Sequence, residues 1–168
     1  LFGSVYGAFT GAKNYKGLFE ITGKGTLLLD EIAELSVDMQ AKLLGVLDKN
    51  KFSPVGSKKE IELEARLIFA TDADLKSEVE LGRFRKQLYY RISVLVIKIP
   101  PLRSHKEDIK SLSVEFAKEN KKILSDGAIK KLENYSWPGN VRELKHCIIR
   151  ACSVSENQLI KEEAITFF

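Results

Sequence analysis

Cysteine and histidine are scarce in this sequence. The 168 residues include two of each, namely Cys147, Cys152, His105 and His146. The two cysteines lie five positions apart in a segment with helical character, so their side chains leave different faces and a disulfide would require the helix to unwind. The four residues do not have the spacing of a zinc-ligand set. We therefore expect free, buried or half-buried thiols and a reducing compartment, the cytoplasm.

Long apolar runs are also lacking. No stretch approaches the ~20 apolar residues that a membrane-spanning helix requires, which argues against a helical membrane protein. The chain begins at Leu1 without a basic and apolar leader. From this start we expect no signal peptide and a segment of a longer protein.

Neither sign of charge dominates. Residues 1–102 carry 15 Lys or Arg and 13 Asp or Glu, and residues 103–168 carry 12 and 10. Each part therefore has a net charge of +2, with both signs interleaved. This pattern is typical of a solvated surface and argues against a basic face that binds nucleic acid.

The first part of the chain is typical of an α/β domain. Residues 25–31 (GTLLLDE) and 64–72 (EARLIFATD) are short apolar runs that predict buried strands. Residues 92–101 (ISVLVIKIPP) predict a third strand, which its prolines end. Residues 36–50 have helical periodicity, with Ser36 as the expected N-cap. Strands that alternate with helices predict a parallel sheet with covered faces.

From residue 103 onward the sequence predicts helices alone. Helical patterns cover residues 105–120, 125–135 and 140–153, and Asn140 is the expected N-cap of the last helix. We therefore expect an α/β domain over residues 1–102, followed by a small all-helical domain over residues 103–168.

Two carboxylates, Asp30 and Glu31, follow the first predicted strand. The carboxyl ends of parallel strands are where α/β sheets bind their ligands. There, one acid can hold a magnesium-bound water while the other polarises a water that attacks a phosphate. The alternative is that both acids only begin the next helix, whose dipole favours negative charge. The pair alone leaves both interpretations open.

Arginines form the second candidate group. Arg85 and Arg91 lie six residues apart before the third predicted strand, with Arg83 beside them. Arginines that cannot fold back onto their own site can reach a neighbour's nucleotide and stabilise charge on its phosphate. Arg142, in the helical part, is placed to contact phosphate when that part closes. The alternative is a surface with scattered cations, some of them paired at helical spacing.

An uncharged hexapeptide, GAFTGA, stands near the start of the chain. None of its side chains can bind a metal, attack a carbonyl or transfer a proton. Its glycines permit backbone movement, while Phe9 supplies an apolar anchor and Thr10 a hydroxyl for a partner. A tight glycine turn is the alternative, but it does not explain the aromatic residue. The predicted partner-binding loop consists of Gly7, Ala8, Phe9, Thr10, Gly11 and Ala12.

Seven segments together resemble one known family. GAFTGA, GTLLLDEIAEL, QAKLL, FRKQLYYRISV, IPPLR, EDI and WPGNVREL occur in the order and spacing of the AAA+ domain of bacterial enhancer-binding proteins, which activate sigma-54 RNA polymerase. The resemblance covers nearly the whole chain, and GAFTGA is its most specific part. It implies a partial AAA+ parallel-sheet ATPase core, followed by a helical lid, with ATP and Mg²⁺ as cofactors.

The resemblance also implies partners. In this family the GAFTGA loop rises from a hexameric ring and contacts sigma-54, and ATP hydrolysis moves the loop to remodel the closed promoter complex. We therefore expect the sigma-54 RNA polymerase holoenzyme as the partner and ring self-association of the complete protein. DNA binding would belong to a C-terminal helix-turn-helix domain outside this chain, and regulatory input domains, of two-component systems among others, would precede it.

Roles for individual residues follow from the same resemblance. Asp30 and Glu31 match the Walker B pair, with Asp30 at the metal and Glu31 at the attacking water. Thr71 and Asp72 match sensor I. The matches to the trans-acting arginine fingers and to the sensor II residue of the lid are Arg85, Arg91 and Arg142.

The sequence departs from the family in three places. The Gly-rich phosphate-binding loop, which the family carries upstream of GAFTGA with two strands, is absent, so we expect this chain alone to be inactive. Asp72 replaces the usual Asn, and a carboxylate cannot donate a hydrogen bond to phosphate. The lead-in GSVYGAFTGA lacks the usual His-Glu and base. Two alternatives therefore remain: another ring AAA+ ATPase, such as a clamp loader or branch-migration helicase, or a non-hydrolysing sigma-54-binding protein.

Overall fold

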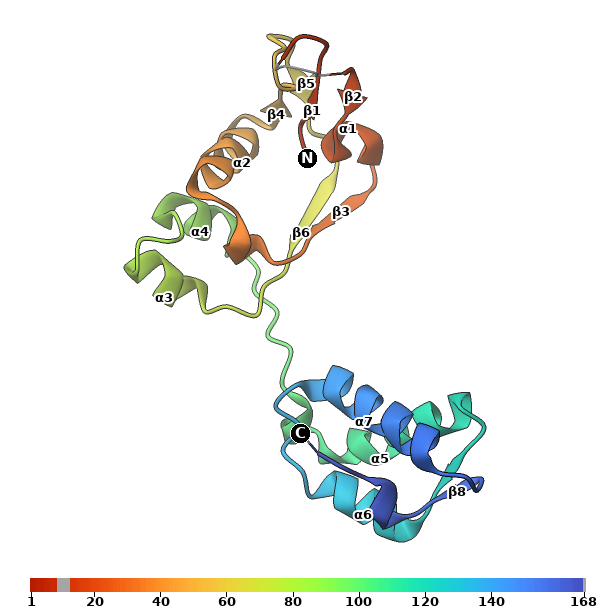
Figure 1. Cartoon of the computed structure of the whole chain (residues 1–168). Coiled ribbons are helices and arrows are strands. Elements are labelled where there is room, and N and C mark those ends of the chain that lie inside the picture. Colours follow the sequence, from red (N-terminus) through yellow and green to blue (C-terminus); the bar gives the residue numbers. More distant parts are fainter. Residues whose placement is uncertain (9–12, 168) are drawn as a thin grey trace. The chain divides into compact units, whose positions relative to one another are not determined.

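The computed structural model describes residues 1–8 and 13–167. The chain divides into two compact units, Leu1–Val96 and Ile97–Phe168, which we call unit 1 and unit 2. Figure 1 shows strands together with helices in unit 1 and mainly helices in unit 2. The predicted boundary, after residue 102, lies six residues beyond the division between the units.

Unit 1 is built around a two-stranded parallel sheet. Strands β3 (Thr26–Leu29) and β6 (Arg66–Phe69) pair in register, with Thr26 opposite Arg66 and Leu29 opposite Phe69. The first two predicted strands and their parallel arrangement are therefore confirmed.

The third predicted strand, over residues 92–101, is wrong. Helix α4 (Lys86–Ile92) includes its first residue, and residues 93–101 form no strand. The side chains of this segment are largely exposed, for example Val94 at 86% and Ile99 at 89%. A strand requires a neighbour that accepts and donates its backbone hydrogen bonds, and the described residues provide none for this segment.

Helices pack beside the sheet and carry most of the unit 1 core. They are α1 (Leu18–Thr22), the 3₁₀ turn η1 (Ile32–Glu34), α2 (Val37–Lys49), α3 (Leu75–Glu80) and α4. Ser36 caps α2 as predicted, because its hydroxyl accepts a hydrogen bond from the Met39 amide at 3.4 Å. The buried apolar core consists of Phe2, Phe19, Ile32, Leu43, Val46, Phe52, Leu63, Phe84 and Leu88.

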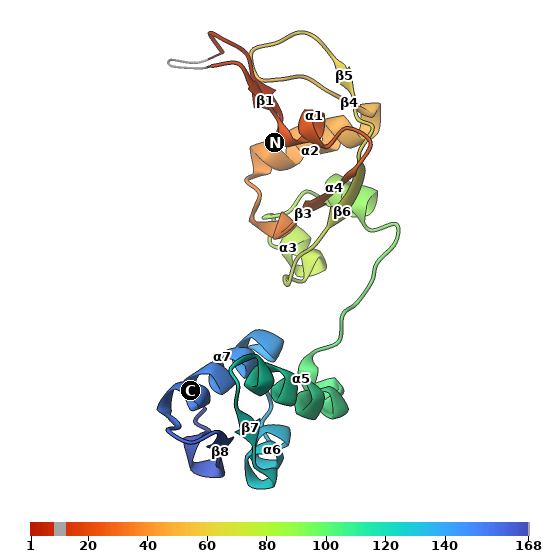
Figure 2. The ribbon, with the colours of Figure 1, turned by 90° about the vertical axis from the view of Figure 1, so that its right-hand side faces the viewer.

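Two short antiparallel ribbons stand at one end of unit 1. Strand β1 (Gly3–Ser4) pairs with β2 (Tyr15–Lys16), and β4 (Lys51–Phe52) pairs with β5 (Ile61–Glu62). Figure 2 shows β1 at the same end of the unit as β4 and β5. A bridge between Ser4 and Val55 joins the two ribbons directly.

Unit 2 contains η2 (Leu102–Ser104), α5 (Lys106–Glu119), α6 (Asp126–Glu133), α7 (Asn140–Val154) and η3 (Glu162–Ala164). The three predicted helices are confirmed, but the expectation of helices alone is wrong. Strands β7 (Ile123–Leu124) and β8 (Leu159–Ile160) form a short parallel pair. Its two segments are 36 positions apart in register, which local patterns do not reveal.

The predicted N-cap of α7 is also wrong. Gly139 occupies the N-cap position, and Asn140 is the first helical residue, with a φ of 53°. The Asn140 side chain instead accepts a hydrogen bond from the Leu102 amide at 2.9 Å. Asn140 thus fastens the start of unit 2 to its longest helix.

The core of unit 2 surrounds Trp137, which is completely buried and donates from Nε1 to the Leu132 carbonyl at 2.8 Å. Both cysteines are free, as predicted; Cys147 is buried and Cys152 is half-buried. Burial raises the pKa of both thiols. Over the described residues, no helix combines the length and the apolar character needed to cross a membrane.

Candidate functional site

The two predicted catalytic acids lie in a loop that leaves the carboxyl end of β3. We call residues 30–35 the acid loop. Glu31 has a left-handed backbone, with φ 51° and ψ 49°, and its amide donates to Asp30 Oδ1 at 3.0 Å. A non-glycine residue in this conformation costs about 1–3 kcal/mol, and such residues cluster at functional sites. Both carboxylates are exposed, and Glu31 makes no side-chain capping bond to η1.

The end of β6 holds the acid loop in place. The Ala70 amide donates to the Leu29 carbonyl, and the Ala70 carbonyl accepts from the Ile32 amide, both at 2.9 Å. Because β3 and β6 are parallel neighbours, the predicted sensor residues Thr71 and Asp72 leave the sheet at the same edge as the acids. The structure thus brings together the acids and the sensor I residues.

Thr71 and Asp72 differ in their surroundings. The Thr71 hydroxyl accepts a hydrogen bond from the Ala73 amide at 3.1 Å. Asp72 is exposed, and within the described part of the chain no salt bridge engages it. Its carboxylate therefore keeps its charge available to whatever approaches this edge of the sheet.

The two predicted finger arginines lie along helix α2. Arg85 is the N-cap residue of α4, and its Nε donates to the Val37 carbonyl at 3.2 Å. Arg91, in the last turn of α4, donates to the Leu47 carbonyl at 2.6 Å and lies 3.6 Å from Asp48. Val37 and Leu47 are about 15 Å apart along the α2 axis. Figure 1 shows α2 and α4 side by side.

Arg83 has a different environment from these two arginines. Its guanidinium donates two hydrogen bonds of 2.7 Å to the Glu78 carboxylate, and the Arg83 amide donates to the Glu78 carbonyl at 2.9 Å. The hydrogen bond from Arg83 holds the pKa of Glu78 below its ordinary value. Arg83 is thus engaged by its own chain, in a bidentate geometry that is among the stronger ion-pair arrangements.

The structure describes only the first two residues of the predicted partner-binding loop. Gly7 and Ala8 are described, whereas Phe9, Thr10, Gly11 and Ala12 lie outside the described residues. At its base, the Ser4 hydroxyl donates to the Lys13 carbonyl at 2.9 Å, and the Tyr6 amide donates to the Asn14 side chain at 2.8 Å.

The β1–β2 ribbon below the loop requires glycine at two facing positions. A Cβ on Gly17 would lie 2.3 Å from the Gly3 nitrogen, and a Cβ on Gly3 would lie 2.4 Å from the Tyr15 carbonyl oxygen. Gly3 also has a φ of 78°. The two backbones therefore approach more closely than any side chain would allow.

The segment between β4 and β5, which the sequence reading did not single out, packs against this base. We call residues 53–59 the support loop. The Val5 amide donates to the Val55 carbonyl at 3.1 Å, and the Val55 amide donates to the Gly3 carbonyl at 3.0 Å. Gly56, with a φ of 82°, lies so close to Ala8 that a Cβ there would meet the Ala8 Cβ at 2.5 Å. The close approaches of Gly17 to Gly3 and of Gly56 to Ala8 identify the support of the loop. The sequence alone does not reveal either of them.

Unit 2 contributes the remaining predicted residue, Arg142, in the first turn of α7. Arg142 is exposed and lines a cavity of about 660 Å³. The chain around Pro101 forms one wall, and α5 contributes Asp108 and Leu112. Polar and apolar side chains of unit 2 thus line the cavity beside Arg142.

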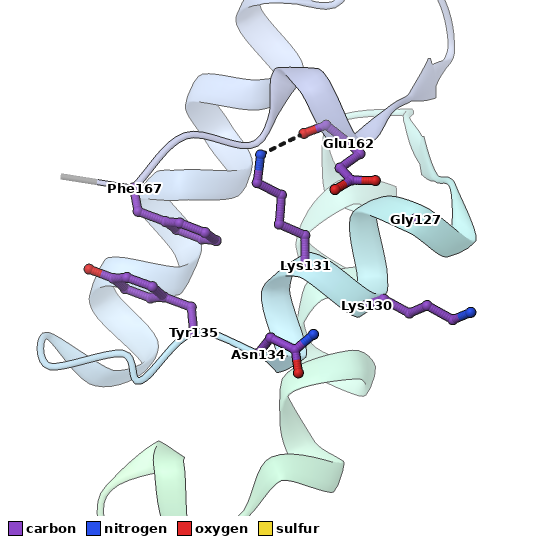
Figure 3. A pocket seen from close by; sticks show the side chains of 7 residues that line it. All are labelled: Gly127, Lys130, Lys131, Asn134, Tyr135, Glu162 and Phe167. Atoms are coloured by element: carbon purple, nitrogen blue, oxygen red, sulfur yellow. Dashed lines mark hydrogen bonds between the residues drawn. The ribbon is translucent and has the colours of Figure 1, made fainter.

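A second cavity of unit 2, about 420 Å³, contains none of the predicted site residues. Figure 3 shows the ring of Tyr135 facing that of Phe167, and the Lys131 amine directed at the Glu162 carbonyl. The ring centroids are 4.0 Å apart, and the Lys131 hydrogen bond is 3.2 Å long. These contacts fasten the C-terminal residues to α6, which is a structural role.

Comparisons with known proteins match both units. Residues 1–98 match the Sigma-54 interaction domain, and residues 103–167 match the AAA+ ATPase lid domain. The chain is 45% identical over 174 residues to the Nif-specific regulatory protein of Klebsiella pneumoniae and 46% identical over 173 residues to that of Azospirillum brasilense. It is 44% identical to the anaerobic nitric oxide reductase transcription regulator NorR of Salmonella paratyphi C.

These matches cover 98–99% of this chain but 28–34% of the relatives, so the chain spans about a third of their length. Among solved structures, NtrX from Brucella abortus matches with a TM-score of 0.87 and 30% identity, over 97% of this chain and 39% of NtrX. NtrX in complex with ATP matches with a TM-score of 0.83 and 29% identity, over 91% of this chain and 38% of NtrX.

The likeness to NtrX extends over both units and agrees with the predicted fold, a partial AAA+ core with a helical lid. The family model over residues 1–98 confirms the predicted family. The chain therefore belongs to the Sigma-54 interaction domain family, and it carries the AAA+ ATPase lid domain after that domain.

Proposed function

We propose that this chain couples ATP hydrolysis to contact with sigma-54 RNA polymerase, as part of a longer activator that works in the cytoplasm. The family is one of AAA+ ATPases. The observation that carries the proposal is the position of Glu31, held in a left-handed conformation at the sheet edge that also presents Thr71. In this proposal residues 1–102 form the catalytic core and residues 103–168 form the lid.

The acid loop suits a metal-assisted attack of water on phosphate. Exposed carboxylate oxygens are the ligands that Mg²⁺ prefers, so Asp30 fits the role of its ligand and Glu31 that of the residue that orients the attacking water. When bound, the metal ion supplies positive charge that offsets the charge of the phosphates. NtrX, a structural relative, has been solved in complex with ATP, and ATP is the nucleotide we propose for the complete protein.

Arg85 and Arg91 fit a role on a neighbouring copy of the protein. Both contact carbonyls of α2 in their own chain. Over residues 1–8 and 13–167, no hydrogen bond or salt bridge joins either arginine to Asp30 or Glu31. A ring in which each copy offers its arginines to the next would use them as fingers, and Arg142 of the lid would serve as sensor II.

The complete protein contains a further part of the same fold in this proposal. On one face of the sheet, Leu28 is 56% exposed and Ile68 is 43% exposed, and residues 94–99 are exposed and apolar apart from Lys98. An upstream part with two strands and a Gly-rich loop would cover such surfaces and supply the backbone N–H groups that bind phosphate. This chain alone is therefore expected to bind ATP weakly or not at all, and a Gly-rich loop encoded upstream of Leu1 would support the assignment.

The GAFTGA loop provides the decisive test. In the complete protein, Thr10→Ala should abolish promoter opening while ATP turnover persists, because the predicted catalytic residues lie elsewhere. Phe9→Ala should act alike, since a few contacts dominate most interfaces. The paired measurement is phosphate release and open-complex formation at a sigma-54 promoter.

Thr166→Ala, at an exposed threonine of unit 2, is the matched control and should change neither measurement. A proportional loss of both activities in Thr10→Ala would assign the loop to the ATPase scaffold. If Thr10→Ala releases phosphate and opens promoters as the parent does, the sigma-54 contact lies outside the loop.

A non-hydrolysing sigma-54-binding protein is the second candidate, and Asp72 favours it. The exposed carboxylate at the sheet edge repels the charge that the transition state spreads over phosphate oxygens. If the complete protein hydrolyses ATP, Asp72→Asn should raise the rate, as measured by phosphate release. A rate of zero for both forms, with sigma-54 binding intact, would support the second candidate.

A further inference from the structure

Gln40 is a polar side chain buried in the middle of α2, with 0% of its surface exposed. Its Nε2 donates to the Leu35 carbonyl at 2.8 Å and to the Arg83 carbonyl at 3.0 Å. Its Oε1 accepts from the Arg85 amide at 2.8 Å. Both amide hydrogens and the carbonyl oxygen are therefore used, which a glutamine side chain achieves only at a site shaped for it.

The three partners of Gln40 belong to two functional segments. Leu35 is the last residue of the acid loop, and Arg85 carries a proposed finger. Gln40 lies 45 positions before Arg85 in sequence and is the hydrogen-bonded link between these segments. Burial of a side-chain amide costs free energy unless all its hydrogen bonds are made. The three hydrogen bonds of Gln40 therefore favour one arrangement of its partners.

Hydrogen bonds extend from Gln40 back to the sheet. The Ala70 carbonyl accepts from the Ile32 amide at 2.9 Å, and the Ile32 carbonyl accepts from the Leu35 amide at 3.4 Å. The Leu35 carbonyl then accepts from Gln40. A continuous series of hydrogen bonds thus joins the end of β6, beside the sensor residues, to the start of α4.

We propose that Gln40 is a positioning residue, which fixes Arg85 of each copy relative to the acid loop of the same copy. The proposal rests on the proposed role of Arg85 as a finger for the neighbouring copy. Its consequence is that a movement of the acid loop at one nucleotide site displaces the arginine that this copy offers to the next site. Gln40 itself, buried under the α4 start, touches no nucleotide.

The variant that tests this is Gln40→Met in the complete protein, since methionine has a similar length and makes none of the three bonds. We expect kcat for ATP hydrolysis to fall about tenfold to a hundredfold, as for small displacements of catalytic groups, with KM changed less than twofold. Gln87→Met is the matched control, because Gln87 is exposed on α4 and its side chain makes no hydrogen bond to the described residues. It should leave both constants at parental values.

A double-mutant cycle separates this proposal from the proposed function. If Gln40 acts through Arg85, Gln40→Met combined with Arg85→Ala should have the kcat of Arg85→Ala alone. Effects that multiply would show that Gln40 acts elsewhere and would overturn the proposal. A parental rate for Arg85→Ala alone would instead refute the finger role, whatever Gln40→Met does.

Amide hydrogen exchange supplies a readout that does not depend on activity. Gln40→Met should accelerate exchange in residues 81–92 of the complete protein, and Gln87→Met should not. Gln40→Glu keeps the acceptor for the Arg85 amide but loses both donors, so it serves if Gln40→Met fails to fold. Parental kcat in whichever variant folds, or parental exchange in residues 81–92, would overturn the proposal.

Discussion

The two units differ in how completely they enclose their apolar side chains. In unit 2, Leu132, Trp137 and Leu144 have 0% of their surface exposed. In unit 1, Ile68 on the central sheet is 43% exposed, and Val94, near the end of the unit, is 86% exposed. Unit 2 encloses the larger core, whereas the sheet of unit 1 leaves apolar side chains exposed, as on surfaces that other parts of a protein cover.

The two units also differ in how many of the proposed functional residues they contain. The acid loop, the sensor residues, the two finger arginines and the GAFTGA loop all belong to unit 1, and unit 2 contributes Arg142 alone. The proposed chemistry is therefore concentrated in the unit whose sheet leaves apolar side chains exposed. Four predictions test that division.

The largest effect should come from the arginines of unit 1. In the complete protein, Arg85→Ala or Arg91→Ala should lower the rate of ATP hydrolysis about 10³-fold or more, because a finger stabilises charge on the transferred phosphoryl group. Nucleotide affinity should hardly change, as measured by calorimetry. Arg66→Ala, at an exposed arginine of β6, is the control. Parental rates for both finger variants would remove these arginines from the mechanism.

The next effect should be on the stability of unit 2. Trp137→Ala should lower its free energy of unfolding by about 3–5 kcal/mol, because it leaves a cavity in the core and removes the indole donor from the Leu132 carbonyl. Val94→Ala should change stability by less than about 0.5 kcal/mol. Denaturant unfolding followed by circular dichroism measures both. Equal losses would mean that the two units do not differ in closure.

A smaller effect should arise at the support loop of unit 1. Gly56→Ala forces a side chain into a left-handed conformation and against Ala8, at a cost of about 1–3 kcal/mol. Displacement of this loop should lower open-complex formation severalfold while ATP turnover continues. Gly45→Ala, in α2 with open space around it, is the control and should be neutral or slightly stabilising. If both variants open promoters normally, the support loop does not act on GAFTGA.

The smallest effect should be the pH dependence of the Glu78–Arg83 pair. The hydrogen bond from Arg83 lowers the pKa of Glu78 in the folded state. The stability that it contributes is therefore present above the unfolded pKa and is lost as pH falls through the folded pKa. Glu78→Gln should flatten the acid side of the stability curve, measured as Tm against pH. Glu80→Gln, exposed on the same helix, should leave that curve unchanged.

Local patterns predicted the elements whose cause is local. The apolar runs that became β3 and β6 were recognisable because buried parallel strands need continuous apolar residues, and Ser36 was recognisable as a cap. The motifs around Asp30, Arg85 and Arg142 contributed to the prediction of the family. Residues 92–101 misled because composition reports apolar character and not the presence of a pairing strand.

What could not be predicted depends on contacts between distant segments. The sequence around Gln40 predicts an ordinary helix residue. Its hydrogen-bond partner Arg85 is 45 positions away in sequence. Gly56 approaches Ala8, and these two loop residues are 48 positions apart in sequence. Asparagine is a residue type that often caps helices, yet the Asn140 side chain accepts a hydrogen bond from the Leu102 amide instead.

The exposed segment before the helical unit bears on handling the isolated chain. Residues 94–97 read VLVI, and Lys98 is the only charged residue between Arg91 and Arg103. Uncharged β-branched segments with open backbone groups pair edge to edge between molecules, and a lysine or a proline opposes such pairing. Lys98 and the nearby Pro100 and Pro101 are residues of the kind that oppose such pairing between copies of this chain.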